Sequence, residues 1–391
     1  MKHSTEFIIM GAGIIGLSAA IALCQRGYQV IVLEKQTCVP VENSNRVYAL
    51  NQSSQTLLEH IGVWQHLDKK RISIYEHMHV WDAFGKAYIT FDARMLARDR
   101  LGIIIEEALL KNALIQCVRD LKIPLIEHWQ TEHIEEKAQG IMITDANQTS
   151  WVGSCMVIAE GASSDTRQKL NIPMTSWPYH QHAIVATVHV EKPHARTAYQ
   201  IFRTEGPLAF LPLVNQQHCS IVWSSESSHI QHLMALSTLE FEKALNTAFE
   251  HTLGVTQLLS PRHSFPLRMQ HVNQYVGSRW IIMGDAAHTI HPLAGLGLNL
   301  GLADLNTFLT CITQFKQPGS RALRTYQRQR KHALWQVILF LQSMHLLFTH
   351  THLPIKILRG LGLRLCHRLP FLKRMMIEQA TGVKTIDTID M

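Results

Sequence analysis

The hydrophobic pattern at the start of the chain predicts a strand, a helix and a second strand. Phe7–Met10 is an apolar run typical of buried parallel strands, and apolar residues then recur at helical spacing over Ile14–Leu23. Tyr28–Leu33 is a second apolar run that ends beside Glu34. This order predicts a βαβ unit, in which two parallel strands are joined by a crossover helix.

Further along, three segments have helical spacing and several short runs have strand character. The predicted helices are Gln52–Ile61, Ile103–Val118 and Leu239–His251. Asn51 is expected near the N-terminal cap of the first helix, and Ser237 and Glu240 are placed to form a capping box at the start of the third. Short strands are predicted at 77–81, 87–91, 124–128, 140–145 and 157–160.

The middle of the chain has a different character. From His182 to Trp223, four short β-rich runs follow one another without long helices between them, which predicts an antiparallel sheet. Trp280–Met283 is again a buried strand, followed by a glycine-rich segment that begins a long helix. The antiparallel sheet is therefore expected as an insertion into an α/β domain.

Three glycines in the first turn add chemistry to the βαβ unit. Gly11 permits the tight turn, Gly13 lets a pyrophosphate approach the backbone, and Gly16 lets helix and strand pack closely. The start of the helix offers free N–H groups to the phosphates, and Glu34 can accept hydrogen bonds from ribose hydroxyls. This pattern predicts a dinucleotide, FAD or NAD, bound by Gly11, Gly13, Ile14, Ile15, Gly16, Glu34 and Lys35.

A second segment also predicts binding of a dinucleotide. It is GDAAHTIHPLAGLGLNLG at 284–301. An apolar strand delivers Asp285, whose carboxylate can accept hydrogen bonds from a polyol such as ribitol. Gly295 and Gly297 bring the backbone close to a flat ligand, and the N–H groups of Leu298 and Asn299 lie near a helix start. The two glycine-rich elements lie far apart in the chain, and both are expected to bind one extended dinucleotide. This arrangement favours FAD, held along its whole length, over NAD.

The composition and charge of the chain indicate which kinds of binding partner are expected. The chain of 391 residues has 37 basic and 30 acidic side chains, a net charge of +7, which suits an anionic cofactor or membrane surface. It contains no long Lys/Arg tract with interleaved aromatic residues, so nucleic acid is not expected as a partner. Seven dispersed cysteines and the lack of a signal-peptide pattern indicate a cytoplasmic protein.

The C-terminal region is apolar and basic. His332–Phe348 is too short and too polar to span a bilayer. Leu353–Met376 places Lys and Arg among Ile, Leu and Phe, a composition that suits the inner face of an anionic membrane or a helical cap with a solvated basic face.

These motifs resemble a known family. G-A-G-I-I-G at 11–16, Glu34, Arg46 within R-V-Y-A-L, and the 284–301 segment are similar to those of the aromatic flavoprotein hydroxylases. Within that family the chain looks like the branch that hydroxylates ubiquinone precursors, and its middle stretch looks most like 2-polyprenylphenol 5-hydroxylases. Two departures stand out: Glu160-Gly161 replaces the usual Asp-Gly pair before Ser164 and Arg167, and Leu296 replaces a common Gln.

The resemblance implies a function. Reduced FAD would react with O₂ to give a C4a-hydroperoxide that hydroxylates a polyprenylphenol ring, with NAD(P)H as the transient reductant. It also implies that Arg46 and Pro292 lie at the FAD and that the substrate wall contains Phe210, Leu211, Pro212 and Leu213. His291 and Pro292 are weak catalytic candidates, and no phenol base is evident. A metal at His288 and His291 is not expected, because neither a carboxylate nor a cysteine completes a ligand set at suitable spacing.

Three alternatives remain open from the sequence. They are hydroxylation at another ring position, hydroxylation of a soluble phenol, and a non-catalytic scaffold subunit of a quinone-biosynthesis complex. Membership of such a complex and a homo-oligomeric state are further possibilities.

The predicted fold class is α/β: a Rossmann-like FAD-binding domain of the aromatic hydroxylase type, an inserted antiparallel-sheet substrate domain and a helical C terminus. The domain boundaries expected from the pattern are 1–70, 98–178 and 270–330 for the FAD-binding domain, 71–97 and 179–269 for the substrate domain, and 331–391 for the helical region.

Overall fold

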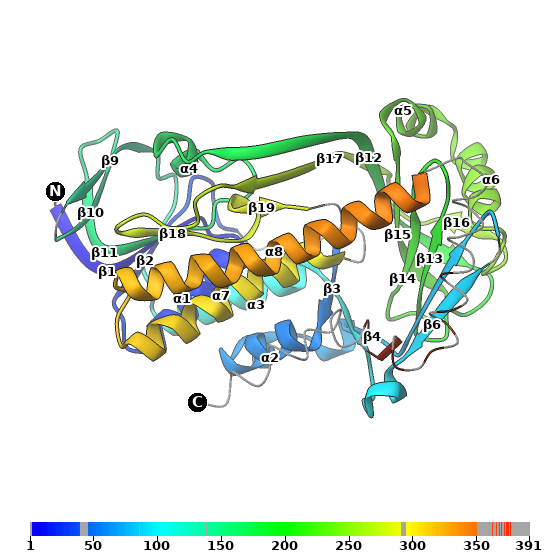
Figure 1. The fold of residues 1–391 in the computed structure, drawn as a ribbon, viewed down its shortest axis with the longest axis horizontal. Helices are drawn as coiled ribbons and strands as arrows, with labels where there is room; N and C mark the ends of the chain where they lie inside the picture. Colours follow the sequence, from blue (N-terminus) through cyan, green and yellow to red (C-terminus); the bar gives the residue numbers. More distant parts are fainter. Residues whose placement is uncertain are drawn as a thin grey trace.

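The computed structural model describes residues 2–39, 46–85, 87–137, 139–290 and 295–349, and eight single positions between 362 and 376. Two β-sheets lie toward opposite ends of an elongated molecule (Figure 1). The first sheet contains, in order, β8 (Leu125–Ile126), β2 (Val30–Leu33), β1 (Lys2–Met10), β11 (Ser150–Ile158), β10 (Gly140–Asp145) and β9 (Thr131–Lys137), with β18 (Trp280–Ile282) paired to β11.

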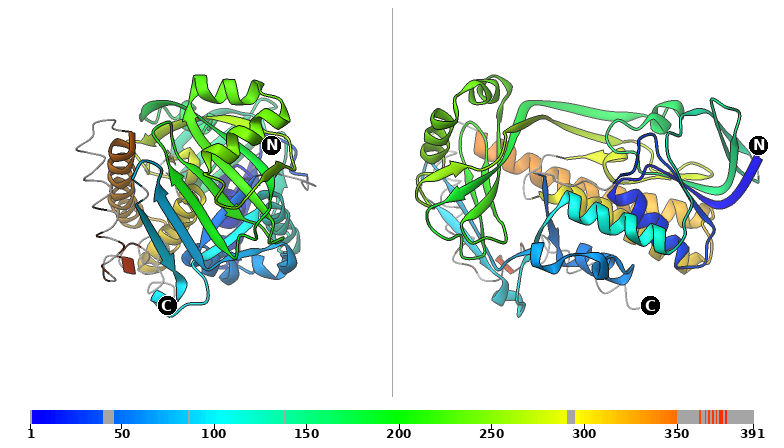
Figure 2. Two further views of the ribbon diagram at one scale, coloured as in Figure 1. Left: turned by 90° about the vertical axis from the view of Figure 1, so that its right-hand side faces the viewer. Right: turned by 180° about the vertical axis from the view of Figure 1, so that it is seen from behind.

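The predicted βαβ unit forms the centre of the first sheet. β1 pairs in parallel with β2 and with β11, and the apolar run Phe7–Met10 is buried. α1 (Ile14–Cys24) packs against α3 (Glu107–Asp120) and against α7 (Leu296–Phe315) on one side of the sheet (Figures 1 and 2). The ring of Phe7 meets the ring of Phe308 from α7 edge-on, at 6.2 Å between centroids. Ile15 of the N-terminal motif lies against Gly284 and Gly301, so this motif and both ends of the 284–301 segment are neighbours in space.

One predicted helix begins later than expected. The helix predicted over Ile103–Val118 is wrong at its start, because Gly102–Glu106 forms strand β7 and the helix, α3, begins at Glu107. β7 pairs on both edges, with β3 (Val47–Asn51) and β4 (Ser73–Tyr75). Three consecutive isoleucines favour this buried central strand, since β-branched side chains pack well in a sheet.

The second sheet has nine strands and holds the predicted antiparallel runs. Its order is β19 (His288–Thr289), β17 (His263–Val272), β12 (Met174–Val190), β15 (His218–Glu226), β14 (Leu208–Pro212), β13 (Thr197–Phe202), β5 (His77–Asp82) and β6 (Tyr88–Asp92), with β16 (Thr256–Leu258) paired to β12. The antiparallel prediction is confirmed for β12, β15, β14 and β13, whereas β13 pairs with β5 in parallel. β12 and β17 run on from the first part of the molecule into the second (Figure 1). The expected domain boundaries stay a prediction.

Two predicted helix starts are confirmed by their caps. The side chain of Asn51 accepts from the backbone N–H of Ser54 at the start of α2 (Gln52–His60). Ser237 and Glu240 form the reciprocal capping box of α6 (Thr238–Ala248). Shorter helices among the described residues are α4 (Asp165–Lys169), α5 (Ser227–Ala235), and 3-10 turns at Val63–His66, Lys69–Arg71, Ala93–Leu96 and Gly284–Ala286.

The long helix α8 (Ser320–Thr349) lies along α7 (Figure 1). Its outer side exposes four large apolar side chains, those of Trp335, Leu339, Phe340 and Leu346. Within the described ranges, none of the helices combines the length and the apolar character needed to cross a membrane. Most of the basic segment Leu353–Met376 lies outside the described residues.

Candidate cofactor and substrate site

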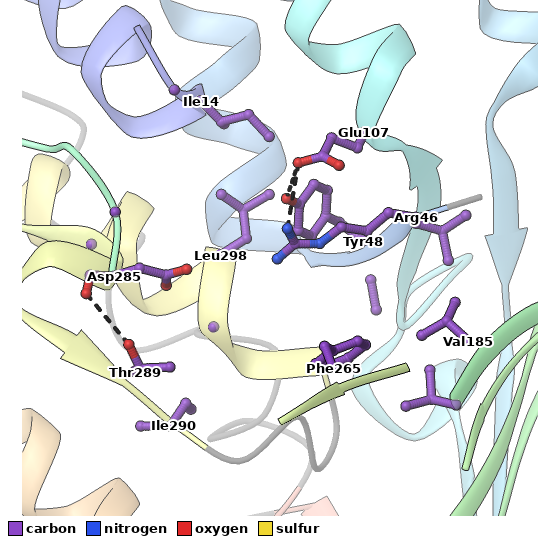
Figure 3. A pocket seen from close by; sticks show the side chains of 18 of the residues that line it. Ile14, Arg46, Tyr48, Glu107, Val185, Phe265, Asp285, Thr289, Ile290 and Leu298 are labelled. Carbon is purple, nitrogen blue, oxygen red and sulfur yellow. Dashed lines mark hydrogen bonds and ion pairs between the residues drawn. The ribbon is translucent and has the colours of Figure 1, made fainter. Parts of the chain in front are cut away.

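One cavity of about 590 Å³ connects the two glycine-rich elements to the second sheet. Its lining includes Gly11, Gly13 and Glu34 at one end and Val185 and Val222 at the other. Figure 3 shows Ile14 and Asp285 on one side of this space, with Val185 and Phe265 of the second sheet across from them. The structure thus brings together segments from the beginning, middle and end of the chain.

The glycines of the two motifs differ in what surrounds them. Gly16 is absent from the cavity lining, and a Cβ on it would lie 1.9 Å from the carbonyl oxygen of Gly11, so Gly16 is required by helix–strand packing. A Cβ on Gly13 would meet no atom nearer than 4.0 Å, and one on Gly297 would meet none within 4 Å. The space beside Gly13 and Gly297 is therefore left open for a ligand that approaches the backbone.

Glu34 lies at the end of β2, as predicted, and lines the cavity. Its carboxylate accepts from the backbone N–H groups of Ala12, at 2.6 Å, and Gln36, at 2.9 Å. These contacts fix the side chain beside the glycine turn. Lys35 instead points to Asp165 at 2.6 Å and is absent from the cavity lining.

Arg46, Tyr48 and Glu107 form a polar cluster in the cavity wall (Figure 3). The Tyr48 hydroxyl donates to Glu107 Oε1 at 2.8 Å, and a guanidinium nitrogen of Arg46 lies 3.6 Å from the same oxygen. Arg46 also lies over the Tyr48 ring, 5.1 Å from its centroid. Burial raises the pKa of Tyr48 far above its usual range, so this phenol stays a neutral donor. The cluster places the Arg46 guanidinium in the cavity wall, next to the Glu107 carboxylate with which it is paired.

Asp285 follows β18, as predicted, and its side chain is open to the cavity although protein surrounds it. Desolvation raises the pKa of Asp285 above its ordinary value, partly offset by the charges of His288 and Arg46. A hydrogen bond from a ligand hydroxyl would favour the ionised form. Thr289 donates back to the Asp285 carbonyl oxygen at 3.4 Å (Figure 3).

A buried charge cluster beneath this loop was missed from the sequence. Asp304, on α7, is fully buried and accepts from Gly284 N at 2.9 Å, His288 Nε2 at 2.7 Å and Arg330 Nε at 2.5 Å. Burial opposes ionisation, but His288 and Arg330 together lower the pKa of Asp304 below its ordinary value. The Nε2 atom of His288 is therefore already bonded to the Asp304 carboxylate. The available signal was an Asp on the apolar face of a long helix.

The side chain of Asn299 links the start of α7 to β3 by hydrogen bonds. Its amide donates to the carbonyl oxygens of Ala49 and Gly295, and its side-chain oxygen accepts from Asn51 N. Gly295, with φ +62°, precedes α7 and packs against Ala49. The predicted helix start is therefore tied to β3, and the first free N–H groups are those of Leu296, Gly297 and Leu298.

Both departures from the family pattern have a structural explanation. The Glu160 carboxylate accepts from Ser164 Oγ at 2.5 Å and from both the N–H and the hydroxyl of Thr166. The longer side chain thus folds back onto the turn that begins α4. Arg167 donates to Ala286 O at 2.8 Å and so ties α4 to the loop after β18. Leu296 packs on the main core and is absent from the cavity lining.

The four predicted substrate-wall residues do not share one face. Leu211 lines the cavity. Phe210 points to the opposite side of β14, where it is fully buried and stacks on Phe249 at 3.7 Å between centroids. Pro212 and Leu213 are absent from the lining, and Leu213 packs in a third core cluster. His291 and Pro292 lie outside the described residues.

Sequence reasoning missed most of the sheet that closes the cavity. The residues that share the Leu211 face and line the cavity include Val185, Ala198, Gln200, Ala209, Ser220, Val222, Ser224 and Phe265. The available signal was alternation along each β-run, because successive side chains of a strand point to opposite faces. Without the register between strands, that alternation does not say which face meets the ligand.

Comparison with known proteins agrees with this geometry. The model of a family described as FAD binding domain matches residues 4–340. The chain is 29% identical to 3-demethoxyubiquinol 3-hydroxylase of Escherichia coli, covering 98% of this chain and 100% of that one. It is 28% identical to the ubiquinone biosynthesis monooxygenase COQ6 of Danio rerio, covering 96% and 89%. Among solved structures, p-nitrophenol 4-monooxygenase PnpA from Pseudomonas putida superposes with a TM-score of 0.79 at 16% identity, covering 97% of this chain and 99% of that one.

The residues of the cavity fit an FAD. The open space beside Gly13 and Gly297 suits close approach of a pyrophosphate and a flat ring, and Glu34 and Asp285 present carboxylates for sugar and ribityl hydroxyls. When bound, FAD supplies the redox chemistry with O₂ and an NAD(P)H reductant, while the chain binds, orients and shields the reactants. The chain belongs to the FAD binding domain family and is an FAD-dependent monooxygenase of the aromatic hydroxylase type.

Proposed function

We propose that this protein hydroxylates the ring of a polyprenylphenol in ubiquinone biosynthesis, at ring carbon 5. The observation that carries the proposal is the continuity of one cavity from the dinucleotide elements to a largely apolar sheet floor. An apolar floor suits an aromatic ring with a hydrocarbon substituent, because burying such surface contributes about 25 cal/mol per Å². The similarity to 3-demethoxyubiquinol 3-hydroxylase of Escherichia coli and to the ubiquinone biosynthesis monooxygenase COQ6 of Danio rerio supports the same substrate class.

In this proposal each group of residues has a defined task. Gly13, Gly297 and Asp285 hold the FAD, and Arg46 provides positive charge at the cavity. The sheet floor around Val222 receives the ring and excludes water. Exclusion of water matters because it strengthens the fixed electrostatic interactions in the site and limits side reactions.

The test is turnover with defined substrates. Protein loaded with FAD is supplied with NADH or NADPH, O₂ and a short-chain 2-prenylphenol, and the product is analysed by mass spectrometry and NMR. We expect the gain of one oxygen atom at ring carbon 5, with reductant consumption matched to product and little hydrogen peroxide. Phenol without a prenyl chain serves as the comparison substrate.

Each alternative has its own outcome in that assay. Oxygen at another ring carbon would correct the position while keeping the substrate class. Efficient hydroxylation of phenol but not of 2-prenylphenol would favour a soluble-phenol hydroxylase. FAD binding without any product from either compound would favour a scaffold subunit in a quinone-biosynthesis complex.

A peripheral contact with the inner face of a membrane is part of the proposal. It is supported by the exposed apolar side chains of α8, among them Trp335, Leu339 and Leu346, because a polyprenyl substrate partitions into lipid. Sedimentation with anionic lipid vesicles tests it. We expect Leu339→Glu to reduce the bound fraction several-fold without changing FAD binding, and equal binding by both proteins would remove α8 from the contact.

A further inference from the structure

Ser220 occupies a distinctive place in the sheet floor. It lies on β15 between β14 and β12, in register with Leu211 on one side and Thr187 on the other. Its neighbours along the strand, Cys219 and Ile221, are buried in the second core. Since side chains alternate along a strand, Ser220 faces the cavity together with Val222.

The hydroxyl of Ser220 has no hydrogen-bond partner among the described residues, and the side chain is fully buried. Such groups are rare in folded proteins, because a buried polar atom without a partner loses its hydrogen bonds to water and gains nothing in return. Leu211, Val222 and Ala209 beside it on the floor are apolar, and the other polar side chains of the floor, Gln200 and Ser224, lie on β13 and nearer the end of β15. A hydroxyl left in this state at a cavity wall indicates a group kept for a ligand.

The position of Ser220 points to the substrate rather than to the cofactor. Val222 pairs directly with Val185, and Val185 lies across the cavity from Ile14 and Asp285 (Figure 3). Ser220 belongs to this same floor of the second sheet, whereas the dinucleotide elements form the other wall.

We propose that the Ser220 hydroxyl binds the phenolic oxygen of the polyprenylphenol and thereby selects which ring carbon faces the flavin. The inference rests on the proposed function and adds a specificity-determining residue to it. A serine hydroxyl can donate one hydrogen bond and accept others, so it can bind a phenol or a phenolate. Holding the phenolic oxygen at Ser220, between the apolar side chains of Leu211 and Val222, leaves the ring a preferred orientation, which apolar contacts alone do not give.

The test compares Ser220→Ala with Ser225→Ala. Ser225 is a fully buried serine on the same strand, but its hydroxyl donates to Glu205 O at 2.7 Å and it does not line the cavity. Binding of short-chain 2-prenylphenol and of the matching prenylbenzene, which lacks the hydroxyl, is followed by the change in absorbance of the bound flavin. Thermal unfolding and FAD affinity are measured on the same preparations.

We expect Ser220→Ala to weaken 2-prenylphenol binding about fivefold, as loss of one neutral hydrogen bond does, and to leave prenylbenzene binding unchanged. FAD affinity should be unchanged, and the unfolding temperature should be equal or higher because an unpaired polar group has been removed. Ser225→Ala should lower the unfolding temperature and keep the wild-type preference for the phenol.

Three results would overturn the assignment. They are equal weakening of the phenol and the hydrocarbon, a loss of FAD affinity, or a drop in unfolding temperature like that of Ser225→Ala. Failure of the proposed function is distinguishable, because wild-type protein would then bind FAD but neither prenyl compound.

Discussion

The two ends of the cavity are built by different means. At the dinucleotide end the backbone forms the surface, and the decisive quantity is the space beside a glycine: none at Gly16, ample space at Gly13. At the sheet end side chains form the surface, and the decisive quantity is which way each one points. There Leu211 faces the cavity while its neighbour Phe210 is in the core. A sequence motif can encode the first kind of surface locally, whereas the second kind depends on the pairing of distant strands.

The stabilising interactions behind the two ends differ as well. The loop after β18 rests on buried charge, with Asp304 bonded to His288, Arg330 and the backbone of Gly284. The sheet end rests on apolar packing against α5 and α6, in which Phe210 takes part. Substitutions can therefore separate the roles of charge, space and packing.

The largest effect is expected at the charge cluster. Asp304→Asn leaves Arg330 buried with a neutral partner and should reduce the free energy of unfolding by about 3–5 kcal/mol, the usual result of breaking a buried ion pair. Urea unfolding measures it. Asp285→Asn, in the same region but open to the cavity, is the control and should alter FAD affinity far more than stability.

Asp304→Asn should also change how the free energy of unfolding depends on pH in the acidic range. Because the pKa of Asp304 is lowered in the folded protein, its contribution is present above the ordinary carboxyl pKa, about 3.9, and is lost as pH falls through the folded value. The difference in stability between wild type and Asp304→Asn should therefore shrink on acidification. A constant difference across that range would mean that the carboxylate is not the stabilising species.

At the sheet end, neighbouring residues should behave in opposite ways. Phe210→Ala removes a fully buried ring that stacks on Phe249, and we expect a loss of about 3–5 kcal/mol in unfolding free energy. Leu211→Ala should change stability much less, since the side chain faces the cavity, but should weaken binding of 2-prenylphenol. The reverse ranking would show that the two faces of β14 have been exchanged.

At the dinucleotide end, two alanine substitutions test the role of space. Gly16→Ala places a Cβ 1.9 Å from the Gly11 carbonyl oxygen, and the shift this forces should cost at least about 1–3 kcal/mol of stability. Gly13→Ala meets only open space in the protein and should leave unfolding unchanged while weakening FAD binding. Retained FAD affinity in Gly13→Ala would move the pyrophosphate away from this glycine.

This contrast also explains how much the sequence could predict. The glycine turn, the Asn51 cap, the capping box at Ser237 and the strand just before Asp285 depend on residues close together in the chain, and the structure contains all of them. The helix predicted over Ile103–Val118 was wrong at its start. Three consecutive isoleucines are compatible with a helix or a strand, and only their pairing with β3 and β4 shows that they form a strand.

The remaining misses share one cause. The orientation of Phe210 depends on its pairing with Tyr199, and the role of Asp304 depends on partners from β19 and α8. The unpaired hydroxyl of Ser220 is visible only when every neighbour is in place. Such features follow from tertiary register, which no local pattern in one sequence contains.

The smallest effect is expected at Tyr48, on the wall formed by β3. Tyr48→Phe removes the 2.8 Å hydrogen bond to Glu107 but leaves Arg46 beside the same carboxylate, which is partly exposed and can take up water. We expect a loss of about 1 kcal/mol in unfolding free energy and a change in FAD affinity of no more than a few-fold. Glu107→Gln is the matched variant, since an amide oxygen can still accept from Tyr48 while the charge beside Arg46 is lost. If Tyr48→Phe abolished FAD binding and Glu107→Gln did not, the phenol itself would contact the cofactor, and the dinucleotide end would also depend on side-chain orientation.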